Sequence, residues 1–449
     1  MQKDFVRKHG GPAPRYTSYP TAPHFHAGID GETYARWLRG LKPGQTLSLY
    51  IHIPWCDRLC WFCGCNTKQT LRYDPLKTYL SALENEMETI SGLVDPECRV
   101  TALHLGGGSP TMLRPEDMVA LNQMLRSRFS FDADAEISVE MDPNDLTAEK
   151  YDALAEIGMT RASIGVQDFD EKVQKAINRE QTFEQTRDVV EQVRARGVRS
   201  VNCDVLYGLP HQTRQSVDQT IKQVLSLSPD RIALFGYAHV PWMKTHQKMI
   251  DEAALPDLTE RFAQMNRAAS TLTSSGYTAI GIDHFALPAD SLAVAAASGS
   301  MRRNFQGYTS DTADALIGMG ASSIGQLPQG YVQNQPSTGE YQRQVNLGQL
   351  PVVRGFELSE EDRIRARIIE LLMCDFAFSF ATIRHEFGGA AESILDEAEY
   401  LATSDTDGMI EFSGGLFQIT PKGQPFVRSV ASAFDGYFGT GVARHSLAV

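Results

Sequence analysis

Six short apolar runs alternate with six amphipathic stretches between residues 46 and 275, and this alternation restricts the fold more than any other feature. The apolar runs predict β-strands at residues 47–53, 100–105, 136–141, 161–165, 200–207 and 231–237. The amphipathic stretches predict α-helices at residues 75–91, 114–128, 147–157, 183–196, 213–227 and 258–275. Repeated strand–helix units imply right-handed crossovers and a parallel sheet, hence an α/β fold. Six units are too few for a closed eight-stranded barrel, so we predict a partial, open (β/α)6 barrel.

The sequence before this region has a different character. Residues 1–45 include a run rich in turn formers and aromatic residues that contains Arg15, Tyr16 and Tyr19 and shows no helical period. Two tyrosines are unusual in a purely solvated tail, so we expect an N-terminal arm that folds over the site. The alternative is a disordered tail. We assign residues 46–340 to the barrel and an extension of it.

Residues 341–449 predict a mainly helical C-terminal domain. Helical patterns near residues 358–373, 380–387 and 392–403 precede a hairpin pattern centred on Gly414 and Gly415. Three helices and a hairpin resemble a winged-helix domain, but the first helix starts in an acidic run and no basic recognition helix stands out. We therefore expect a lid or packing domain rather than a DNA-binding domain.

The charge and composition of the chain argue against several classes of partner. A net charge of −13 disfavours nucleic acid and anionic membranes, because both require a basic face. No stretch approaches the ~20 apolar residues of a membrane span, and the N-terminus has no secretory signal. Free cysteines without a signal indicate a reducing compartment. We expect a cytoplasmic protein, and its acidic surface is compatible with a monomer.

Four cysteines lie within ten residues: Cys56, Cys60, Cys63 and Cys65. The first three form a C-x3-C-x2-C motif directly after the predicted strand at residues 47–53. Three thiolates in one loop can hold three irons of a [4Fe–4S] cluster and leave the fourth iron open to a substrate or cofactor. A structural zinc site is the main alternative, but zinc usually takes two separated pairs of ligands, and the other three cysteines are scattered singly. A disulfide framework is less expected in a long chain with seven cysteines.

Other residue types suited to ligand binding follow the predicted strands. Gly106, Gly107 and Gly108 come directly after the second strand, where glycines let a ligand approach the backbone and expose N–H groups to it. A tight turn is the simpler reading of the glycines alone. Glu140 closes the third strand, and Asp204 lies inside the apolar fifth strand. A hydrogen-bonded structural role for Asp204 is about as plausible as a functional one.

Together, the cysteine motif after the first strand and the glycines after the second resemble the radical S-adenosylmethionine (SAM) superfamily. Longer runs resemble the oxygen-independent coproporphyrinogen III oxidases: Pro14-Arg15-Tyr16-Thr-Ser-Tyr19-Pro-Thr, Leu49-Tyr50-Ile-His52-Ile-Pro54, Cys63-Gly-Cys65-Asn66, Gly165-Val-Gln167-Asp-Phe169, Tyr207-Gly-Leu-Pro210 and Arg303-Asn-Phe305-Gln-Gly-Tyr308. The resemblance spans nearly the whole chain. Related haem chaperones typically lack the arm at residues 15–19 and the fourth cysteine, here Cys65. The resemblance therefore favours the oxidase over a non-catalytic haem chaperone, which remains the alternative.

The resemblance implies a role for individual residues. Cys56, Cys60 and Cys63 would ligate the [4Fe–4S] cluster, whereas Cys65 matches an additional catalytic-site cysteine that is not a ligand. The family binds two SAM molecules. Contacts to the first are implied for Tyr50, Gly107, Glu140 and Ile324. Contacts to the second are implied for Phe62, Gly108, Ser109, Gln167, Arg179, Asp204 and Ala238, and Ser109 stands where Thr is common in the family.

The resemblance also implies a reaction. One electron passed from the cluster into SAM would give methionine and a 5′-deoxyadenosyl radical, which takes a β-hydrogen from a propionate side chain of coproporphyrinogen III. The propionate then loses carbon dioxide and one electron and becomes a vinyl group. Two propionates react in this way, giving protoporphyrinogen IX in haem biosynthesis. A small flavodoxin or ferredoxin is the electron donor that the resemblance implies.

The predicted substrate is a tetra-anion, whereas the chain is acidic overall. Cations must therefore face the pocket, and arginine binds carboxylates well. We expect Arg15 and Arg303 to anchor propionates, because both lie in aromatic-rich runs that match the family. The simpler alternative for either arginine is a surface or packing residue.

Overall fold

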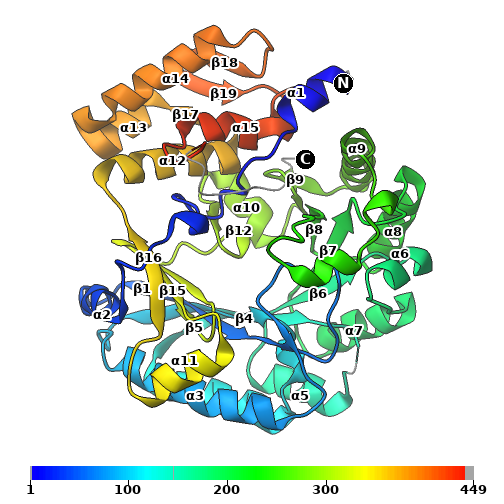
Figure 1. Cartoon of the computed structure of the whole chain (residues 1–449), viewed down its shortest axis with the longest axis vertical. Coiled ribbons are helices and arrows are strands. Elements are labelled where there is room, and N and C mark those ends of the chain that lie inside the picture. Colours follow the sequence, from blue (N-terminus) through cyan, green and yellow to red (C-terminus); the bar gives the residue numbers. More distant parts are fainter. Residues whose placement is uncertain (1–2, 145, 440–449) are drawn as a thin grey trace.

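The computed structural model of the chain describes residues 3–144 and 146–439, which form one large sheet covered by helices and a separate C-terminal layer (Figure 1). Seven neighbouring strands of the sheet are parallel, in the order β13-β1-β4-β5-β6-β7-β8. Their bounds are Thr46–Ile53 (β1), Arg99–Gly107 (β4), Ser130–Met141 (β5), Arg161–Gln167 (β6), Ser200–Tyr207 (β7), Arg231–Gly236 (β8) and Ala315–Met319 (β13). The six predicted strands are all present.

The sheet is extended by antiparallel strands at both ends and does not close. At one end stand β14, β15 and β16, and at the other β10 and β9. Their bounds are Ile324–Leu327 (β14), Gly330–Asn334 (β15), Val352–Glu357 (β16), Thr278–Ile280 (β9) and His284–Ala286 (β10). Among the described strands, β16 and β9 pair on one side only within this sheet. The predicted α/β class with a partial, open barrel is confirmed.

The six predicted helices are present within two residues of their expected ends. They are Asp74–Ser91 (α3), Pro115–Arg128 (α4), Ala148–Glu156 (α5), Phe183–Ala195 (α7), Arg214–Ser226 (α8) and Leu258–Ser274 (α9). Thr182 and Thr213 begin α7 and α8 with capping boxes, each hydroxyl accepting from the N–H three residues on. Thr147 stands at the N-cap of α5, although its side chain makes no capping hydrogen bond there.

The hydrophobic core lies between the sheet and these helices. Leu47, Leu49 and Ile51 of β1 are fully buried in it, as are Leu83 and Met87 of α3. Alternate residues of a strand point to opposite faces, so these three residues share the outer face of β1. The other face of the sheet carries polar side chains, including His52 and His104, and this inner face leads to the site.

The polar start of β5 differs from the sequence prediction. The strand begins at Ser130 rather than at residue 136, because Ser130 and Phe131 pair with Arg99 and Val100 of β4. Backbone pairing forms this part of the strand, and its side chains are largely exposed. An apolar pattern therefore marks only the buried second half.

Several short elements were not predicted from the sequence. They are Lys3–His9 (α1), Gly31–Arg39 (α2), Trp55–Cys56 (β2), Lys68–Gln69 (β3), Glu171–Ala176 (α6), Ser291–Ser298 (α10), Arg302–Asn304 (β11), Gly307–Thr309 (β12) and Thr338–Asn346 (α11). The helices α1 and α2 flank the turn-rich run at residues 10–21, which contains no helix, as expected. The helix α2 is capped by Asp30, whose carboxylate accepts from the Thr33 N–H.

The N-terminal segment packs against the C-terminal part of the chain. Tyr16 and Tyr19 are buried, and the Tyr16 hydroxyl donates to Asp435 at 3.1 Å. The guanidinium group of Arg428 donates to the carbonyl oxygens of Ala13 and Pro14. The arm is therefore held by buried polar contacts and is an ordered part of the fold.

The C-terminal layer contains the predicted helices and hairpin. It comprises Glu360–Asp375 (α12), Ala377–Ser379 (β17), Phe380–Phe387 (α13), Glu392–Ser404 (α14), Ile410–Ser413 (β18), Leu416–Ile419 (β19) and Val427–Ala431 (α15). It has its own core, which includes the fully buried Ile368, Leu372 and Phe417. The main sheet runs on to Glu357 through β16, so we propose that the C-terminal domain begins after Glu357 rather than at residue 341.

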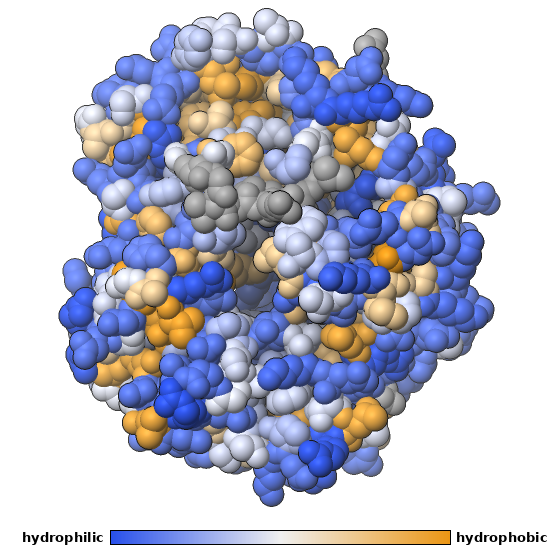
Figure 2. All heavy atoms as spheres, in the orientation of Figure 1, coloured by the Kyte–Doolittle hydropathy of each residue, from blue (hydrophilic) through white to orange (hydrophobic). Residues whose placement is uncertain are grey.

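Hydrophilic side chains dominate the face shown in Figure 2, and the surface is hollowed near its centre, between the C-terminal layer and the barrel. None of the helices in the described part of the chain combines the length and the apolar character that a bilayer crossing requires.

Candidate active site

The carboxyl ends of β1, β4, β5, β6 and β7 surround a cavity of about 220 Å³, which we call the cysteine cavity. Parallel strands bring their carboxyl ends to one edge of the sheet, so residues far apart in sequence meet there. The predicted site residues that line this cavity are Cys56, Cys60, Phe62, Cys63, Cys65, Gly107, Gly108, Ser109, Glu140, Gln167, Arg179 and Asp204. Tyr50, Ala238 and Ile324 are not among the lining residues, and Arg15 and Arg303 lie at a second cavity.

The loop that carries the cysteines is closed at its base by a short parallel pairing of β2 with β3. Within it, the Cys63 N–H donates to the Cys60 carbonyl at 3.2 Å, and the Cys65 N–H donates to the Cys63 sulfur at 3.4 Å. Hydrogen bonds from the side chain and the backbone of Cys65 lower the pKa of Cys63, although burial opposes this. Cys65 is exposed and Cys60 is buried.

The three thiols of the C-x3-C-x2-C motif lie around one cavity, as ligands of a shared iron–sulfur cluster must. Cys56, Cys60 and Cys63 line the same cavity. In the described residues, no group of three or more Cys, His, Asp or Glu side chains has the geometry to hold one metal ion. A four-iron cluster takes one thiolate per iron, so its ligands stand further apart than those of one zinc ion.

The glycines at the carboxyl end of β4 are required by close packing. A Cβ atom on Gly107 would lie 2.5 Å from the His52 ring, and one on Gly108 would lie 2.6 Å from the Trp55 carbonyl oxygen. Gly107 also has φ +111°, which favours glycine. The Gly107 N–H donates to Glu140 and the Gly108 N–H donates to the Ile53 carbonyl. The expectation that these glycines expose free N–H groups is therefore wrong for both positions, since the protein itself accepts those hydrogen bonds.

Glu140 is held at the centre of the cavity by partners from β4. Its Oε2 accepts from the Gly107 N–H at 2.9 Å, and its Oε1 lies 3.2 Å from Nε2 of His104. Burial alone would raise the pKa of Glu140, but the hydrogen bond and the charge of His104 lower it below its ordinary value. The ring of His104 in turn stacks on Tyr50, with centroids 5.7 Å apart. Glu140 is therefore a fixed carboxylate that favours ionisation.

Two histidines on the inner face were not singled out from the sequence. His104 orients Glu140, and Nδ1 of His52 lies 2.9 Å from the Tyr50 hydroxyl. Nε2 of His52 lies 3.0 Å from the Asn66 carbonyl, at the end of the cysteine loop. The available signal was their position on the face of the sheet that also carries Tyr50. His52 follows Tyr50 by two residues on β1, and His104 of β4 lies beside Tyr50.

Arg179 ties the loop after α6 to the ends of β5 and β6. It pairs closely with Asp142 and donates to the Gly165 carbonyl at 3.1 Å and to Gln181 Oε1 at 3.0 Å. Its Nη1 also lies 3.8 Å from the sulfur of Cys60. Asp142 and Gln181 were not predicted as site residues, although Asp142 does close a predicted strand.

Asp204 is a half-buried carboxylate in the carboxyl half of β7. Asn202 donates to it at 2.8 Å and Ser163 at 3.4 Å. Burial raises its pKa to about 6, which the hydrogen bond from Asn202 opposes. Gln167, at the end of β6, adopts φ +64°, a conformation that costs a non-glycine residue energy. Both side chains face the cysteine cavity.

A segment after β8 fastens the cysteine loop from the other side. Gln247, in the short helix Thr245–Met249 (η3), is fully buried. Its amide donates to the carbonyl oxygens of Phe62 at 3.0 Å and of Ala238 at 3.2 Å. One side chain thus joins Phe62 and Ala238, two of the seven positions at which the resemblance implies contacts to the second SAM. Ile324 begins β14, next to Gly318 of β13, and is partly exposed.

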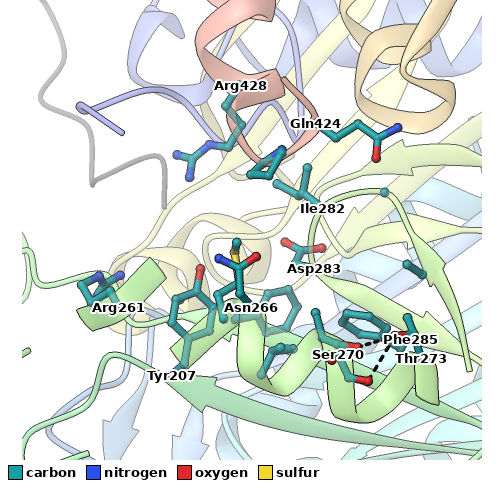
Figure 3. A pocket seen from close by; sticks show the side chains of 18 of the residues that line it. Tyr207, Arg261, Asn266, Ser270, Thr273, Ile282, Asp283, Phe285, Gln424 and Arg428 are labelled. Carbon is teal, nitrogen blue, oxygen red and sulfur yellow. Dashed lines mark hydrogen bonds between the residues drawn. The ribbon is translucent and has the colours of Figure 1, made fainter. Parts of the chain in front are cut away.

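A second cavity of about 350 Å³ lies between the carboxyl ends of β7 and β8, α9 and the C-terminal layer (Figure 3). Four arginines line it, and we call it the arginine cavity: Arg15, Arg261, Arg303 and Arg428. In Figure 3, Arg428 reaches down from the C-terminal layer, and Tyr207 and Asp283 project from the barrel below. Among the described lining residues, Asp283 is the only carboxylate.

The arginines of this cavity donate to backbone carbonyl groups. Arg15 donates to Gly236 at 3.0 Å, and Arg303 donates to Tyr16 at 3.2 Å and to Arg15 at 3.1 Å. Nη1 of Arg303 is buried and has no hydrogen-bond partner within residues 3–144 and 146–439. Burial and the charges of Arg15 and Arg303 lower the pKa of Arg428 to about 10. This is a concentration of positive charge in an acidic chain.

Comparison with known proteins identifies relatives over almost the whole length. A model of the radical SAM superfamily matches residues 50–224, and one of the HemN C-terminal domain matches residues 358–426. The oxygen-independent coproporphyrinogen III oxidase of Bradyrhizobium diazoefficiens is 45% identical over 436 residues, which is 97% of each chain. The anaerobic coproporphyrinogen III oxidase 1 of Cereibacter sphaeroides is 46% identical over 435 residues, covering 97% of this chain and 96% of the relative.

The fold agrees with these sequence matches. The structure of the coproporphyrinogen III oxidase HemN from Escherichia coli, described as a radical SAM enzyme, superimposes with a TM-score of 0.90 at 38% identity. The match covers 94% of this chain and 98% of that one. The chain therefore belongs to the radical SAM superfamily and, within it, to the family of oxygen-independent coproporphyrinogen III oxidases.

Proposed function

We propose that this chain catalyses the oxygen-independent oxidative decarboxylation of two propionate side chains of coproporphyrinogen III, giving protoporphyrinogen IX. The observation that carries the proposal is the convergence of three cysteine thiols, Gly107 and Gly108 at the end of β4, and Glu140 on one cavity. Family membership supports the same reaction, because relatives at 45% identity are named oxygen-independent coproporphyrinogen III oxidase.

In this proposal Cys56, Cys60 and Cys63 hold a [4Fe–4S] cluster, and Cys65 stays free on the exposed side of the loop. When bound, the cluster supplies the electron that cleaves SAM and makes a radical able to take an unactivated hydrogen. The chain itself fixes the ligand loop, through β2–β3 pairing on one side and Gln247 on the other. Rigid support of this kind keeps reacting groups within a narrow range of distances.

Two SAM molecules are proposed, as the family resemblance implies. The first would contact Tyr50, Gly107, Glu140 and Ile324, and an ionised Glu140 suits the ammonium group of SAM. The second would contact Phe62, Gly108, Ser109, Gln167, Arg179, Asp204 and Ala238. Of these residues, Arg179 already donates hydrogen bonds to Asp142, Gln181, Gly165 and the Cys60 sulfur. Its proposed role in the second site is therefore to position Cys60 and the loop.

The arginine cavity is the proposed site for the substrate's carboxylates. Arg15 and Arg303, expected as propionate anchors, both line it, and Arg261 and Arg428 join them. Guanidinium groups bind carboxylates through charge-assisted hydrogen bonds. Because Arg15 comes from the N-terminal arm and Arg428 from the C-terminal layer, both segments would act as a cover that contributes to substrate binding. Excluding water in this way protects a radical intermediate from side reactions.

The remaining properties follow from less specific observations. All seven cysteines are free thiols, which supports a reducing, cytoplasmic location. A small flavodoxin or ferredoxin is the proposed electron donor, and the acidic composition is compatible with a monomer.

The test is an anaerobic assay of the reconstituted, reduced protein for carbon dioxide release from coproporphyrinogen III, with Cys60→Ala as the control. The proposal expects two molecules of carbon dioxide per porphyrinogen and no release by the variant. Stable haem capture without decarboxylation would instead identify a haem chaperone. Decarboxylation by Cys60→Ala at the wild-type rate would rule out the cluster mechanism.

A further inference from the structure

Asp283 is the only carboxylate among the described residues that line the arginine cavity. It lies in the turn between β9 and β10, where its carbonyl oxygen accepts from the Leu234 N–H of β8 at 2.7 Å. Figure 3 shows its carboxylate projecting into the space below Arg428. The backbone of Asp283 is therefore fixed to the sheet, while its side chain faces the cavity.

One oxygen of this carboxylate is held by the protein, and the other is not. Oδ1 lies 2.7 Å from Nδ1 of His284. The His284 ring is itself fixed, because it makes edge contacts with the rings of Phe235 and Tyr308, at centroid distances of 5.4 Å and 5.3 Å. Oδ2 has neither a hydrogen bond nor an ion pair to any residue that the structure describes. Asp283 thus offers one oriented acceptor oxygen to a ligand.

Asp283 keeps its negative charge inside a cationic cavity. Burial would raise its pKa, but the hydrogen bond and the charge of His284, together with the charges of Arg303 and Arg15, hold the pKa below its ordinary value. The side chain is 18% exposed, and within the described chain its only ion-pair partner is His284. The charge of Asp283 is therefore not neutralised by a guanidinium group bound to it.

The proposed substrate presents two kinds of group to this cavity. Its four propionates are anionic, so the charge of Asp283 repels them. Its four pyrrole rings each carry an N–H donor, and the methylene bridges between them let the rings tilt and direct these N–H groups to one face of the macrocycle. A carboxylate is a strong acceptor for such donors. The chemistry of the substrate therefore matches Asp283 to the centre of the macrocycle and the arginines to its propionates.

We propose that Asp283 accepts hydrogen bonds from the pyrrole N–H groups of the macrocycle and makes the cavity select a porphyrinogen over the oxidised porphyrin. The inference rests on the proposed function, which supplies the substrate. A porphyrin is planar, and two of its four central nitrogens carry no hydrogen, so their lone pairs face the carboxylate. A site built to bind an N–H group rejects an analogue that lacks it, because the buried acceptor is then left unpaired.

The test measures the binding of both oxidation states of the ring without turnover. Reconstituted protein is prepared anaerobically without SAM and titrated by calorimetry with coproporphyrinogen III and, separately, with coproporphyrin III, which carries the same propionates. The variants are Asp283→Asn, which removes the charge at nearly constant size, and Asp283→Glu, which keeps a carboxylate. Denaturant unfolding checks that each variant is folded, and carbon dioxide release is assayed separately.

The matched control is Asp311→Asn. Asp311 is half-buried like Asp283, accepts from the Ala313 N–H at 3.0 Å and is not among the described residues that line the arginine cavity. Its affinity for either tetrapyrrole should stay within about twofold of the wild type, because its charge is screened from the cavity.

We expect the wild type to bind coproporphyrinogen about tenfold or more tightly than coproporphyrin, as hydrogen bonds to a charged group suggest. Asp283→Asn should weaken coproporphyrinogen binding by about the same factor. The same variant should bind coproporphyrin at least as tightly as the wild type, because a negative charge has left the cavity. Asp283→Glu should keep part of the preference for coproporphyrinogen.

The sign of the change separates this role from a purely electrostatic one. If Asp283 contributed only negative charge, Asp283→Asn would bind the tetra-anionic coproporphyrinogen more tightly. That result would overturn the proposal, as would unchanged binding, equal weakening for both tetrapyrroles, or the same loss in Asp311→Asn.

The two assays also separate the Asp283 proposal from the proposed function. A wild-type protein that selects coproporphyrinogen but releases no carbon dioxide would contradict the proposed function alone. An active wild-type protein that binds both tetrapyrroles equally would contradict only the role of Asp283, and this comparison needs no variant.

Discussion

Arg179 in the cysteine cavity is buried, whereas Arg303 in the arginine cavity is half-buried, and their surroundings also differ. Arg179 is paired with Asp142 and also donates to Gln181 and Gly165. Arg303 donates to two backbone carbonyls and lies over the Tyr308 ring, and its Nη1 has no hydrogen-bond partner in the described chain. The first arginine holds the protein together, and the second retains capacity for an anion.

The difference extends to the two cavities as wholes. In the cysteine cavity, Glu140 is bound by His104 and Gly107 of the adjacent strand β4, and Asp204 is bound by Asn202 of its own strand and Ser163 of β6, so the site is preformed by the sheet. The arginine cavity is assembled from the N-terminal arm, α9, β11 and α15. Among its described lining residues, Asp283 is the only carboxylate. A preformed cofactor site beside a cationic site that is assembled from the N-terminal arm and the C-terminal layer suits a reaction in which the substrate must be enclosed.

The largest effect is expected at Arg179. Replacing it with Ala leaves Asp142 buried without its partner, which typically costs about 3–5 kcal/mol of stability. We expect a lower midpoint of denaturant unfolding and a lower iron content after reconstitution, because Cys60 loses its neighbour. Arg179→Lys should recover only part of the stability, since a lysine ammonium cannot donate to Asp142, Gln181 and Gly165 with the geometry of a guanidinium group. Wild-type stability in Arg179→Ala would contradict the structural role.

A pH dependence follows from Asp204. Its folded pKa of about 6 lies above its ordinary value of 3.8, so protonation favours the folded state. The stability contribution is therefore fully present below about pH 4 and is lost as the pH rises through 6, by up to about 3 kcal/mol. The difference in unfolding free energy between the wild type and Asp204→Asn should change over this range. A constant difference from pH 4 to 7 would show that Asp204 titrates normally.

Arg303 should affect substrate binding more than stability. Arg303→Ala removes a charge-assisted contact worth about 1.5–3 kcal/mol, which corresponds to a 10–150-fold rise in the KM for coproporphyrinogen III. The affinity for SAM should stay near the wild-type value. Arg303→Lys is the matched variant and should recover part of the loss. A change in SAM affinity as large as the change in KM would remove the distinction between the two cavities.

The smallest effect is expected at the contact that holds the arm. Tyr16→Phe removes one buried hydrogen bond to Asp435, so the arm should bind less tightly by about 1–2 kcal/mol. Limited proteolysis near the N-terminus should become faster, and the KM for the substrate should rise modestly because Arg15 lies next to Tyr16. Equal proteolysis rates for the variant and the wild type would argue against this anchoring contact.

The two regions also differ in how far the sequence predicts them. The cysteine motif is contiguous, and the strands that carry the glycines, Glu140 and Asp204 have strong apolar patterns, so the cysteine cavity was predictable. His52, His104 and Asp142 were missed because their roles depend on which residues face one another across strands. Ser130 and the start of β5 were missed because backbone pairing, rather than apolar burial, forms that part of the strand.

The arginine cavity was predictable only in part. Arg15 and Arg303 were expected from family-like runs, but Arg261 and Arg428 have no local pattern that distinguishes them from surface arginines. Arg428 reaches the cavity through its contact with Pro14, which is 414 residues away, and Arg261 donates to Gly208 and Tyr237, which are 53 and 24 residues away. Such long-range packing is not encoded in local periodicity, and the same reason explains why the short strands β14 to β16 were not foreseen individually.

The most direct measurement of the central claim uses coproporphyrinogen III that carries deuterium at the β-carbons of its propionates. The reconstituted protein is incubated anaerobically with SAM and a reductant, and the 5′-deoxyadenosine is analysed by mass spectrometry. Deuterium is expected to appear in 5′-deoxyadenosine in step with carbon dioxide release, and Cys60→Ala is expected to form neither product. Protoporphyrinogen formed without deuterium in 5′-deoxyadenosine would contradict the central claim.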